Sequence, residues 1–428
     1  MTGNKKNPWN SDDEREHHGS VLEWWAIESF FKTTEDNKKW ALKGVFTEWF
    51  DTKNDNGSIF NLTLYDKDKD KHYTCYLRSD GKKLQTVSNK FEVKYEGCFI
   101  KGAYPNYKMS LQDKENDIKI DIDYHAEALP HWVVQDITNG WLPMGVGFYR
   151  YGFIHKNRIN GKMKIKDKIY KIEGKGYFEH VWGDFLYDNP LKNITGLRKT
   201  IPIYCRLIFW WLENRRIKIP NSIKISTENN PFGYDWAWAL FDNGWTIYYG
   251  NILFWLMEGP AIGTLILTKD GEEYKEFCNI NFHYNKTQHA KNYDFYYPTE
   301  FELVAQDKNE KICLKFKMTT RAREYVSRFR KGKHWLGFVI CEAPGIVEGY
   351  YSNNKKTIKL KGIAKIEPQR QVSIIGHNSL KIDIMKPPKG VGISLNFESH
   401  YLKKNIFTKI QLIPYPKIKF NFKSINKY

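Results

Sequence analysis

Short segments in which polar and apolar residues alternate recur along the chain, and this pattern constrains the fold more than any other feature. Residues 118–124, 380–384, 391–397 and 418–422 place a hydrophobic side chain at every second position. A period of two is typical of β-strands that bury one face. No long segment with the period of an amphipathic helix competes with this pattern. The sequence therefore predicts a mostly-β fold.

Dipeptides that favour tight turns separate many of these segments. Asn-Gly and Asp-Gly pairs begin at Asn56, Asp80, Asn139, Asn160, Asn243 and Asp270. Such pairs adopt the positive φ angles that two-residue hairpins require. The turns and the alternating segments together predict antiparallel meanders, which close into barrels or sandwiches.

Composition limits the classes of protein to which the chain can belong. The 428 residues are 41% hydrophobic and 16% aromatic, which excludes a disordered protein and allows two or three domains. The net charge of +18 favours an anionic partner, either nucleic acid or an acidic membrane surface. Because the basic residues are spread along the chain and no RNP-like motif is present, a nucleic-acid partner is not expected.

The cysteines and the N-terminal segment give no sign of a metal or of secretion. None of the six cysteines has CxxC spacing or accompanies a zinc-finger His pair, so we expect neither a metal site nor a disulfide framework. The first ten residues are polar and lack the apolar core of a signal peptide. The expected location is the cytoplasm, with membrane association as an additional expectation.

One segment departs from the β pattern. Residues 201–212 are nearly all apolar and are followed by Arg215, Arg216 and Lys218. Twelve residues are too few to span a bilayer. The segment could be an interfacial membrane anchor, a lid over a hydrophobic cavity, or an element packed between two domains. The anchor alternative predicts a peripheral contact between residues 201–218 and an anionic membrane, and the other two alternatives stay open.

This segment also divides the chain. The predicted N-terminal domain spans residues 1–187, and residues 188–231 form a linker or insertion. The predicted C-terminal domain spans residues 232–428 and includes extra C-terminal strands.

The most informative motif lies at residues 174–184. If this window is a strand, Tyr177 and Glu179 lie on one face, while His180 and Trp182 lie on the other. Beside an apolar cavity, desolvation would raise the pKa of Glu179 and make it a proton donor. The structural alternative is a buried hydrogen bond between Glu179 and Tyr177 that satisfies two polar groups.

Several motifs together resemble a known family. The central window contains Gly174, Gly176, Tyr177, His180, Trp182 and Gly183. An earlier strand contains Glu23-Trp24-Trp25, and a later one contains Gly233-Tyr-Asp-Trp236. In this order they resemble the AttH-like and hydroxyneurosporene-synthase (carotenoid 1,2-hydratase) family of tandem lipocalin-like proteins. The resemblance covers about residues 18–187 and 232–370.

This resemblance implies two barrel-like domains, a cleft for an isoprenoid or polyketide, and neither a metal nor an organic cofactor. It also maps proton delivery onto Glu179 and Tyr177. Two positions depart from the family pattern: Glu179 replaces an Asp, and Ala26 replaces a Tyr after Glu23-Trp24-Trp25. The longer side chain of Glu179 displaces the carboxyl group by about one bond, which can cost about a hundredfold in catalysis.

The predicted site follows from these motifs. Glu179 and Tyr177 are the expected catalytic residues, and no metal ligand is expected. The expected substrate-binding residues are Glu23, Trp24, Trp25, His131, Trp132, His180, Trp182, Asp235 and Trp236. Because strand neighbours alternate, Tyr177 and Glu179 are predicted to line the barrel lumen, with His180 packed in the domain interface.

Two functions remain open from the sequence. The first is cofactor-free hydration or cyclisation of a hydrophobic small molecule, with Glu179 as the proton donor. The second is non-catalytic lipid binding or transport at a membrane surface. Nucleophile-elbow, P-loop and HExxH motifs are missing from the sequence, which disfavours nucleophilic hydrolysis and phosphoryl transfer.

Overall fold

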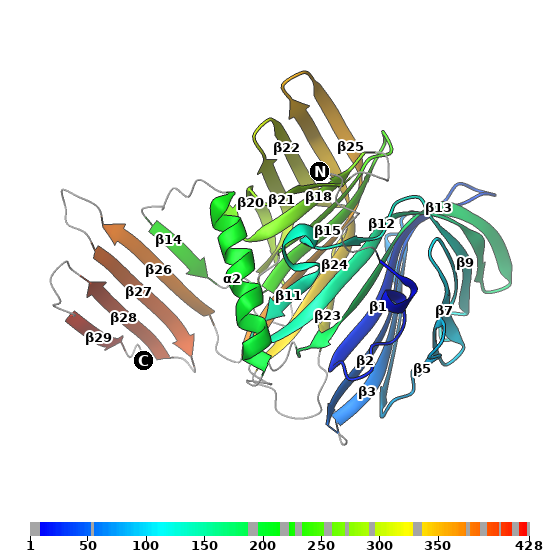
Figure 1. Ribbon diagram of the computed structural model, residues 1–428, viewed down its shortest axis with the longest axis horizontal. Coiled ribbons are helices and arrows are strands. Elements are labelled where there is room, and N and C mark those ends of the chain that lie inside the picture. The colour runs from blue at the N-terminus through cyan, green and yellow to red at the C-terminus, as the bar shows by residue number, and fades with distance from the viewer. Residues whose placement is uncertain are drawn as a thin grey trace.

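The computed structural model is mostly β, as the sequence predicted, with two curled antiparallel half-barrel sheets (Figure 1). The described residues are 9–52, 55–186, 196–214, 222–226, 233–251, 259–269, 274–290, 296–327, 336–373, 377–385, 392–401, 404–412 and 419–425.

The first sheet contains thirteen strands in the order β4-β3-β2-β1-β13-β12-β9-β8-β7-β6-β5, with β10 and β11 paired to β12. Its strands are β1 (Leu22–Thr33), β2 (Lys39–Thr52), β3 (Asp55–Asp66), β4 (Lys71–Asp80), β5 (Gln85–Thr86), β6 (Phe91–Tyr95), β7 (Cys98–Ala103), β8 (Asn106–Asp113), β9 (Ile118–Ala126), β10 (His131–Trp132), β11 (Trp141–Met144), β12 (Gly147–Ile165) and β13 (Lys168–Asp184).

The second sheet contains eleven strands in the order β17-β20-β21-β22-β24-β25-β15-β16-β18-β19, with β23 paired to β24. Its strands are β15 (Gly233–Phe241), β16 (Thr246–Asn251), β17 (Gly259–Ala261), β18 (Gly263–Thr268), β19 (Tyr274–Phe277), β20 (Ile280–His289), β21 (Tyr296–Gln306), β22 (Glu310–Met318), β23 (Arg323–Ser327), β24 (Leu336–Asn353) and β25 (Thr357–Ser373).

A third, smaller sheet takes up the C-terminal strands. Its order is β14-β26-β27-β28-β29, from β14 (Ser222–Ser226), β26 (His377–Met385), β27 (Gly392–Tyr401), β28 (Lys404–Leu412) and β29 (Lys419–Ile425). The sequence-based division had joined these last strands to the second barrel. In the structure they form a sheet with β14, which lies in the sequence between the strands of the two large sheets. The domain boundaries are therefore a proposal.

The helices are few. A 3-10 helix, η1 (Ser11–Glu14), precedes β1, α1 (Gln135–Thr138) follows β10, and α2 (Leu197–Glu213) follows β13. In the described part of the chain, no helix combines the length and hydrophobicity needed to cross a bilayer. The expected contact segment 201–218 lies partly in α2, and its residues 215–218 are outside the described residues.

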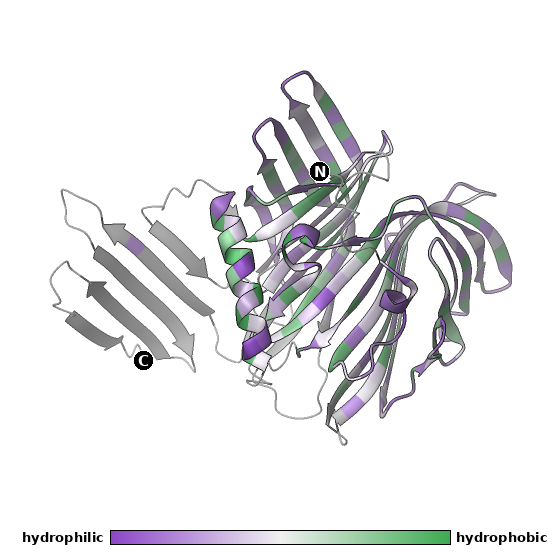
Figure 2. Ribbon diagram, viewed as in Figure 1, coloured by the Kyte–Doolittle hydropathy of each residue, from purple (hydrophilic) through white to green (hydrophobic). Residues whose placement is uncertain are grey.

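Helix α2 packs on the large sheets through one side. Leu207 is fully buried, the Tyr204 hydroxyl donates to the Gly145 carbonyl at 3.0 Å, and Trp211 Nε1 donates to the Ala261 carbonyl at 2.9 Å. The expectation of an element packed against the barrels is thus met by this side of α2. Hydrophobic and hydrophilic residues both occur along the whole length of α2 (Figure 2).

The two large sheets meet through β1, β2, β12 and β13 of the first and β15, β16, β24 and β25 of the second. Each half-barrel has a hydrophobic core of its own, and a third core lies between the sheets. In this third core, the ring of Tyr177 lies 5.4 Å from Trp236 and 5.6 Å from Trp238. The contact between the sheets therefore reaches the motif that the sequence singled out.

Candidate active site

Strand β13 carries the central motif between β1 and β12. Glu179 is paired with Ala26 on β1 and with Phe153 on β12. Ala26 and Glu179 both line a cavity between the two large sheets. Because Ala26 is small, it leaves room directly beside the Glu179 carboxyl group, where a Tyr would project its ring into the cavity.

The predicted orientation of this motif was wrong. Tyr177 and Glu179 share one face, as expected, but this face lies between the two sheets and not in the lumen of the first. His180 points to the other side, where its ring stacks on Trp25 at 4.7 Å. The reason is that the first half-barrel fills its own interior with side chains such as Phe178, which leaves the cavity at the junction of the sheets.

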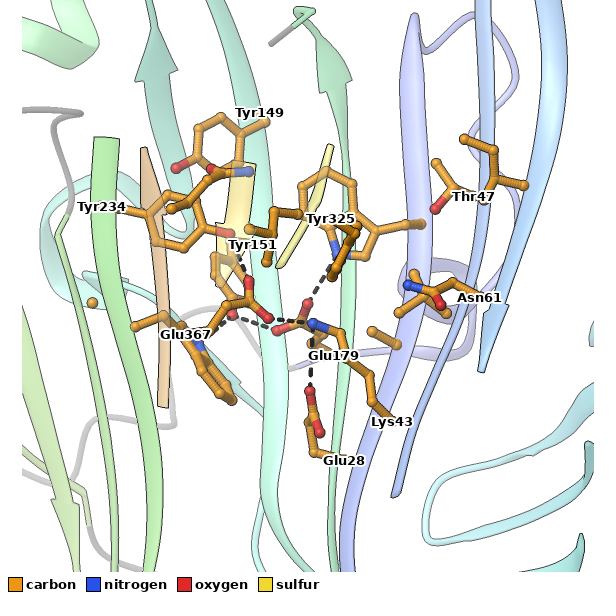
Figure 3. A pocket seen from close by; sticks show the side chains of 18 of the residues that line it. Glu28, Lys43, Thr47, Asn61, Tyr149, Tyr151, Glu179, Tyr234, Tyr325 and Glu367 are labelled. Carbon is orange, nitrogen blue, oxygen red and sulfur yellow. Dashed lines mark hydrogen bonds and ion pairs between the residues drawn. The ribbon is translucent and has the colours of Figure 1, made fainter. Parts of the chain in front are cut away.

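Glu179 lies at the wall of the cavity, next to Tyr151 (Figure 3), and accepts three hydrogen bonds. Trp24 Nε1 donates to Oε1 at 2.9 Å, the Tyr177 hydroxyl donates to Oε2 at 2.9 Å, and the Tyr151 hydroxyl also donates to Oε2. Burial raises the pKa of Glu179 and outweighs the opposite effect of these three hydrogen bonds. The carboxyl group therefore holds its proton at higher pH than an exposed Glu does.

Tyr151 connects Glu179 to the cavity. Its hydroxyl lies 3.0 Å from the Tyr177 hydroxyl and accepts a hydrogen bond from Trp236 Nε1 at 3.1 Å. Burial, followed by the charge of Glu179, raises the pKa of Tyr151 well above its ordinary value. Because Tyr151 lines the cavity, its neutral hydroxyl can pass a proton between Glu179 and a bound molecule.

The cavity is small, with a volume of about 140 Å³. Cavities of about 150 Å³ hold a benzene ring, so the space fits one ring or one isoprene unit. Its aromatic lining provides ring faces that attract a cation. The aromatic side chains of the lining are Trp24, Tyr76, Tyr149, Tyr151, Tyr234, Trp236, Tyr248 and Tyr325.

A buried ionic cluster borders the cavity, on the strands where the two sheets meet. Lys43 Nζ bonds to Glu367, lies 2.8 Å from Glu342 Oε2, and lies 3.6 Å from Glu28 Oε1. Lys365 Nζ lies 3.3 Å from Glu28 Oε2. Burial raises the pKa of Glu28 to about 8, against the opposing effect of the two lysines. The ionic cluster therefore contains one carboxyl group that favours its neutral form.

The raised pKa of Glu28 predicts a pH dependence of stability. Glu28 is neutral in the folded protein up to about pH 8 but ionises at about its ordinary 4.5 when unfolded, so its contribution to stability declines between these values. Glu28→Gln cannot ionise and is expected to gain stability relative to wild type as pH rises from about 5 to about 8. Urea unfolding at both pH values measures this. If the free energies of unfolding of the two proteins differ by the same amount at both pH values, the raised pKa of Glu28 is contradicted.

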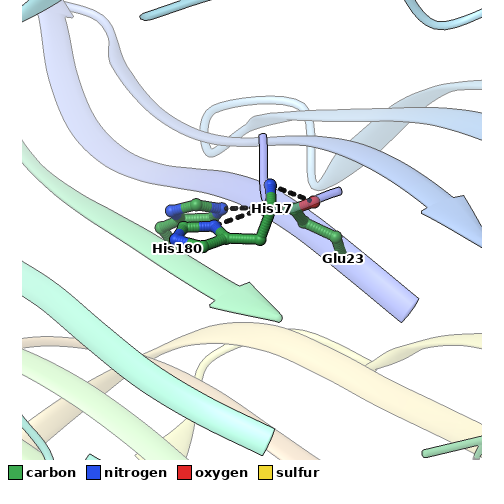
Figure 4. A group of neighbouring side chains, drawn as sticks. All are labelled: His17, Glu23 and His180. Atoms are coloured by element: carbon green, nitrogen blue, oxygen red, sulfur yellow. Dashed lines mark hydrogen bonds and ion pairs between the residues drawn. The ribbon is translucent and has the colours of Figure 1, made fainter. Parts of the chain in front are cut away.

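A second polar group lies on the opposite face of β13 (Figure 4). Glu23 Oε1 lies 2.8 Å from His180 Nε2 and 3.0 Å from His17 Nδ1, and His180 Nδ1 lies 2.7 Å from the Asp13 carbonyl oxygen. His17, Glu23 and His180 each offer one atom that could bind a metal, all within 4.8 Å. These groups already bond to one another, and a carbonyl can only accept, so His180 and Glu23 share a proton. His17 also stacks on Trp182 at 3.7 Å.

The remaining predicted site residues lie in the protein core, away from the cavity lining. His131 stacks on Tyr274 at 4.3 Å, and burial lowers its pKa to about 3. Trp132 is buried, and Asp235 holds the buried Arg370 at 2.8 Å. Of the eleven predicted residues, the structure therefore brings Glu179, Trp24 and Trp236 to the cavity wall, with Tyr177 directly behind Glu179.

Sequence reasoning missed Tyr151 and the ionic cluster. A phenol-rich run, Tyr149-Arg-Tyr151, precedes the central motif, but only the pairing of β12 with β13 shows that Tyr151 reaches Glu179. Lys43, Glu342 and Glu367 lie on strands of two different sheets. No local spacing in the sequence could have indicated that they meet.

Solved structures identify the fold. Neither a family model nor a curated protein matches the chain. An AttH candidate from Nitrosomonas europaea has a similar structure, with a TM-score of 0.56 and 14% identity over 85% of this chain and 96% of that chain. Kievitone hydratase from Nectria haematococca matches with a TM-score of 0.52 and 13% identity over 84% of this chain and 92% of that chain. The chain thus has the tandem lipocalin-like fold of AttH-like proteins that its motifs predicted.

Proposed function

We propose that the cavity between the two sheets protonates a carbon–carbon double bond of an apolar small molecule, leading to hydration or cyclisation. The observation that supports this most is Glu179, a buried acid with a raised pKa at the wall of an aromatic cavity. A solved protein of the same fold is named a hydratase, which agrees with this class of reaction. Perturbed acids in enclosed sites are the usual proton donors of such chemistry.

The proposed reaction begins with proton transfer. In the structure the Tyr151 hydroxyl donates to Glu179 Oε2, so the proposed step requires this hydroxyl to rotate toward a substrate carbon. Protonated Glu179 then donates to the Tyr151 oxygen while the Tyr151 hydroxyl proton moves to that carbon. The π electrons of the double bond form the new C–H bond, and the adjacent carbon becomes a cation. The ring faces of Trp24 and Trp236 stabilise that cation, by about 2 kcal/mol each where water is excluded.

The reaction ends with capture of the cation. In hydration, a water oxygen bonds to the cation and then loses a proton, which returns to Glu179 through Tyr151. In cyclisation, a second double bond of the substrate attacks the cation and loss of a proton closes the cycle. No electrons are gained or lost overall, so neither route requires an oxidant or a reductant. Both routes regenerate the same acid.

The cavity volume limits the part of the substrate that reacts. About 140 Å³ accommodates one ring or one isoprene unit, so the rest of a longer isoprenoid or polyketide must lie outside it. The expected substrate therefore has a small unsaturated or aromatic end that enters between Ala26 and the tyrosines. This remains a proposal about substrate class.

Mass spectrometry of organic extracts from gently purified protein tests the proposal. An unsaturated isoprenoid or polyketide at one equivalent per chain is the expected result, and its hydrated or cyclised product should form on incubation. Anionic phospholipid alone would contradict the enzyme proposal and favour the alternative, a non-catalytic lipid carrier at a membrane surface.

The outer side of α2 supports a membrane contact as a second proposal. Ile201, Ile208, Phe209 and Leu212 are exposed by 52%, 40%, 61% and 41%, and the exposed Arg198, Lys199 and Arg206 lie on the same helix. An exposed apolar helix side with basic residues suits an anionic membrane surface.

Substitutions on α2 test this contact. The double variant Phe209→Ser and Leu212→Ser is expected to bind anionic liposomes at least about tenfold more weakly, because each buried apolar side chain contributes about 1.5–3 kcal/mol. Ile169→Ser is the control, because Ile169 is 65% exposed but lies on β13. Co-sedimentation measures both. An equal loss of liposome binding in the α2 double variant and in Ile169→Ser would contradict a contact through α2.

A further inference from the structure

A second, larger groove also lies between the two large sheets. Its volume is about 610 Å³, within the range of small-molecule sites. Every second residue of β1 and of β2 faces one of three sites. In order along each strand, these sites are the candidate active site, the ionic cluster and this groove. On β1 these residues are Trp24, Ala26, Glu28, Phe30 and Lys32, and on β2 they are Thr47, Val45, Lys43, Ala41 and Lys39.

The ionic cluster separates the groove from the cavity. Glu28, Lys43 and Lys365 are buried, and each lies within 4 Å of an opposite charge in the cluster. Breaking one partner out of a buried ion pair is strongly unfavourable, so a ligand chain cannot pass through this layer without a large penalty. The groove is therefore a compartment of its own.

One wall of the groove is hydrophobic and open to solvent. Phe30 and Trp40 come from the first sheet, and Ile346 and Ile363 come from the second. Ile346 is 41% exposed and Ile363 is 38% exposed, which makes them two of the few large aliphatic side chains left open on the described surface. Exposed apolar surface of this kind, lining a concavity, marks a binding site for an apolar group.

Positive charge surrounds this apolar wall. Lys39, Lys67 and Arg158 line the groove and are exposed, and they have no acidic partner among the described residues. Two further lysines of the lining are neutralised, Lys32 by Glu173 at 3.1 Å and Lys175 by Glu127. Asp242 is a lining acid without a basic partner among the described residues, so the unpaired side chains of the lining carry two more positive than negative charges.

We propose that this groove binds a single-chain amphipathic anion, whose apolar chain packs on Ile346 and Ile363 and whose charged group pairs with Lys39 and Lys67, which are neighbours in the structure. A neutral lipid would gain nothing from the excess positive charge of the lining. A cationic amphiphile would be repelled. This site is independent of the reaction proposed for Glu179, because the ionic cluster lies between them.

Calorimetric titration with decanoate, kept below its micelle concentration, tests the proposal. Wild type is expected to bind one decanoate per chain, and to bind decyltrimethylammonium at least about tenfold more weakly. Added salt should weaken decanoate binding, because exposed charges are screened. Equal affinity for the two amphiphiles, or binding only to phospholipid vesicles and not to decanoate, would overturn the proposal.

Charge reversal locates the site. The triple variant Lys39→Glu, Lys67→Glu and Arg158→Glu is expected to bind decanoate at least about tenfold more weakly. The matched control reverses Lys101, Lys162 and Lys168, exposed lysines that lie outside the groove lining, and should bind like wild type. Unchanged affinity in the groove variant, or an equal loss in the control, would contradict this location.

One single substitution completes the test. Glu179→Gln should leave decanoate binding unchanged, so a failure of the groove proposal and a failure of the proposed reaction can be told apart. A loss of decanoate binding in Glu179→Gln would contradict two independent sites.

Discussion

Glu179→Gln is expected to lower turnover by about 10²–10⁴-fold while the substrate still binds, because general acid catalysis contributes about this much. The amide keeps the size of the carboxyl group, and its oxygen can still accept the hydrogen bond from Trp24. It cannot release a proton to Tyr151. The measurement is the rate of conversion of the molecule extracted with the protein, together with its dissociation constant.

Glu276→Gln is the matched control for this experiment. Burial raises the pKa of Glu276 to about 7, and it binds Thr264 and the backbone of Val134, away from the cavity lining. If Glu276→Gln keeps full turnover while Glu179→Gln loses it, turnover depends on an acid in the cavity and not on any buried acid. Wild-type turnover in Glu179→Gln would exclude Glu179 as the acid.

The second large effect is on stability. Lys43→Met is expected to lower the free energy of unfolding by about 3–5 kcal/mol, the usual result of removing one partner from a buried ionic group. Met fills a similar volume, so the effect comes from Glu342 and Glu367, which lose their shared cation, whereas Glu28 is uncharged at neutral pH. Urea denaturation at neutral pH measures the change.

A second substitution should reverse part of this loss. Burial alone would raise the pKa of Glu342, but Lys365, Lys43 and Arg323 together hold it below its ordinary value. Without Lys43, its negative charge becomes unfavourable, so the double variant Lys43→Met and Glu342→Gln should be more stable than Lys43→Met. If the double variant is the less stable of the two, charge imbalance is not the cause of the loss.

The direction of this pKa shift also predicts how acid changes the stability of the wild-type protein. The lowered pKa of Glu342 stabilises the fold above about pH 4.5, and this stability declines as pH falls toward the lowered value. The effect of Glu28 has the opposite direction. The ionic cluster therefore favours intermediate pH.

Local alternation was enough to predict the strands and the shared face of Tyr177 and Glu179. It could not predict what that face covers, because the curvature of the first sheet and its contact with Trp236 depend on strands far away in the sequence. The pattern in residues 201–212 was compatible with several structures. Only contacts such as Leu207 with the core between the sheets show which side of α2 is buried.

The structure also explains the effect of one departure from the family pattern. In the sequence, Ala26 was only a missing phenol, whereas in the structure it lies opposite Glu179 and helps to form the cavity. The ionic cluster shows the same limit more strongly. Lys43 and Glu367 are 324 residues apart and become neighbours only when the two sheets pack together.

Infrared difference spectroscopy of wild type against Glu179→Gln tests the central claim most directly, since it requires no knowledge of the substrate. The difference isolates the Glu179 carboxyl group, whose protonated C=O stretch can be followed through a pH titration. We predict a midpoint above the ordinary value of 4.5 for this group, as burial requires. A midpoint at or below that value would show that the three hydrogen bonds outweigh burial, and Glu179 could not be the proton donor.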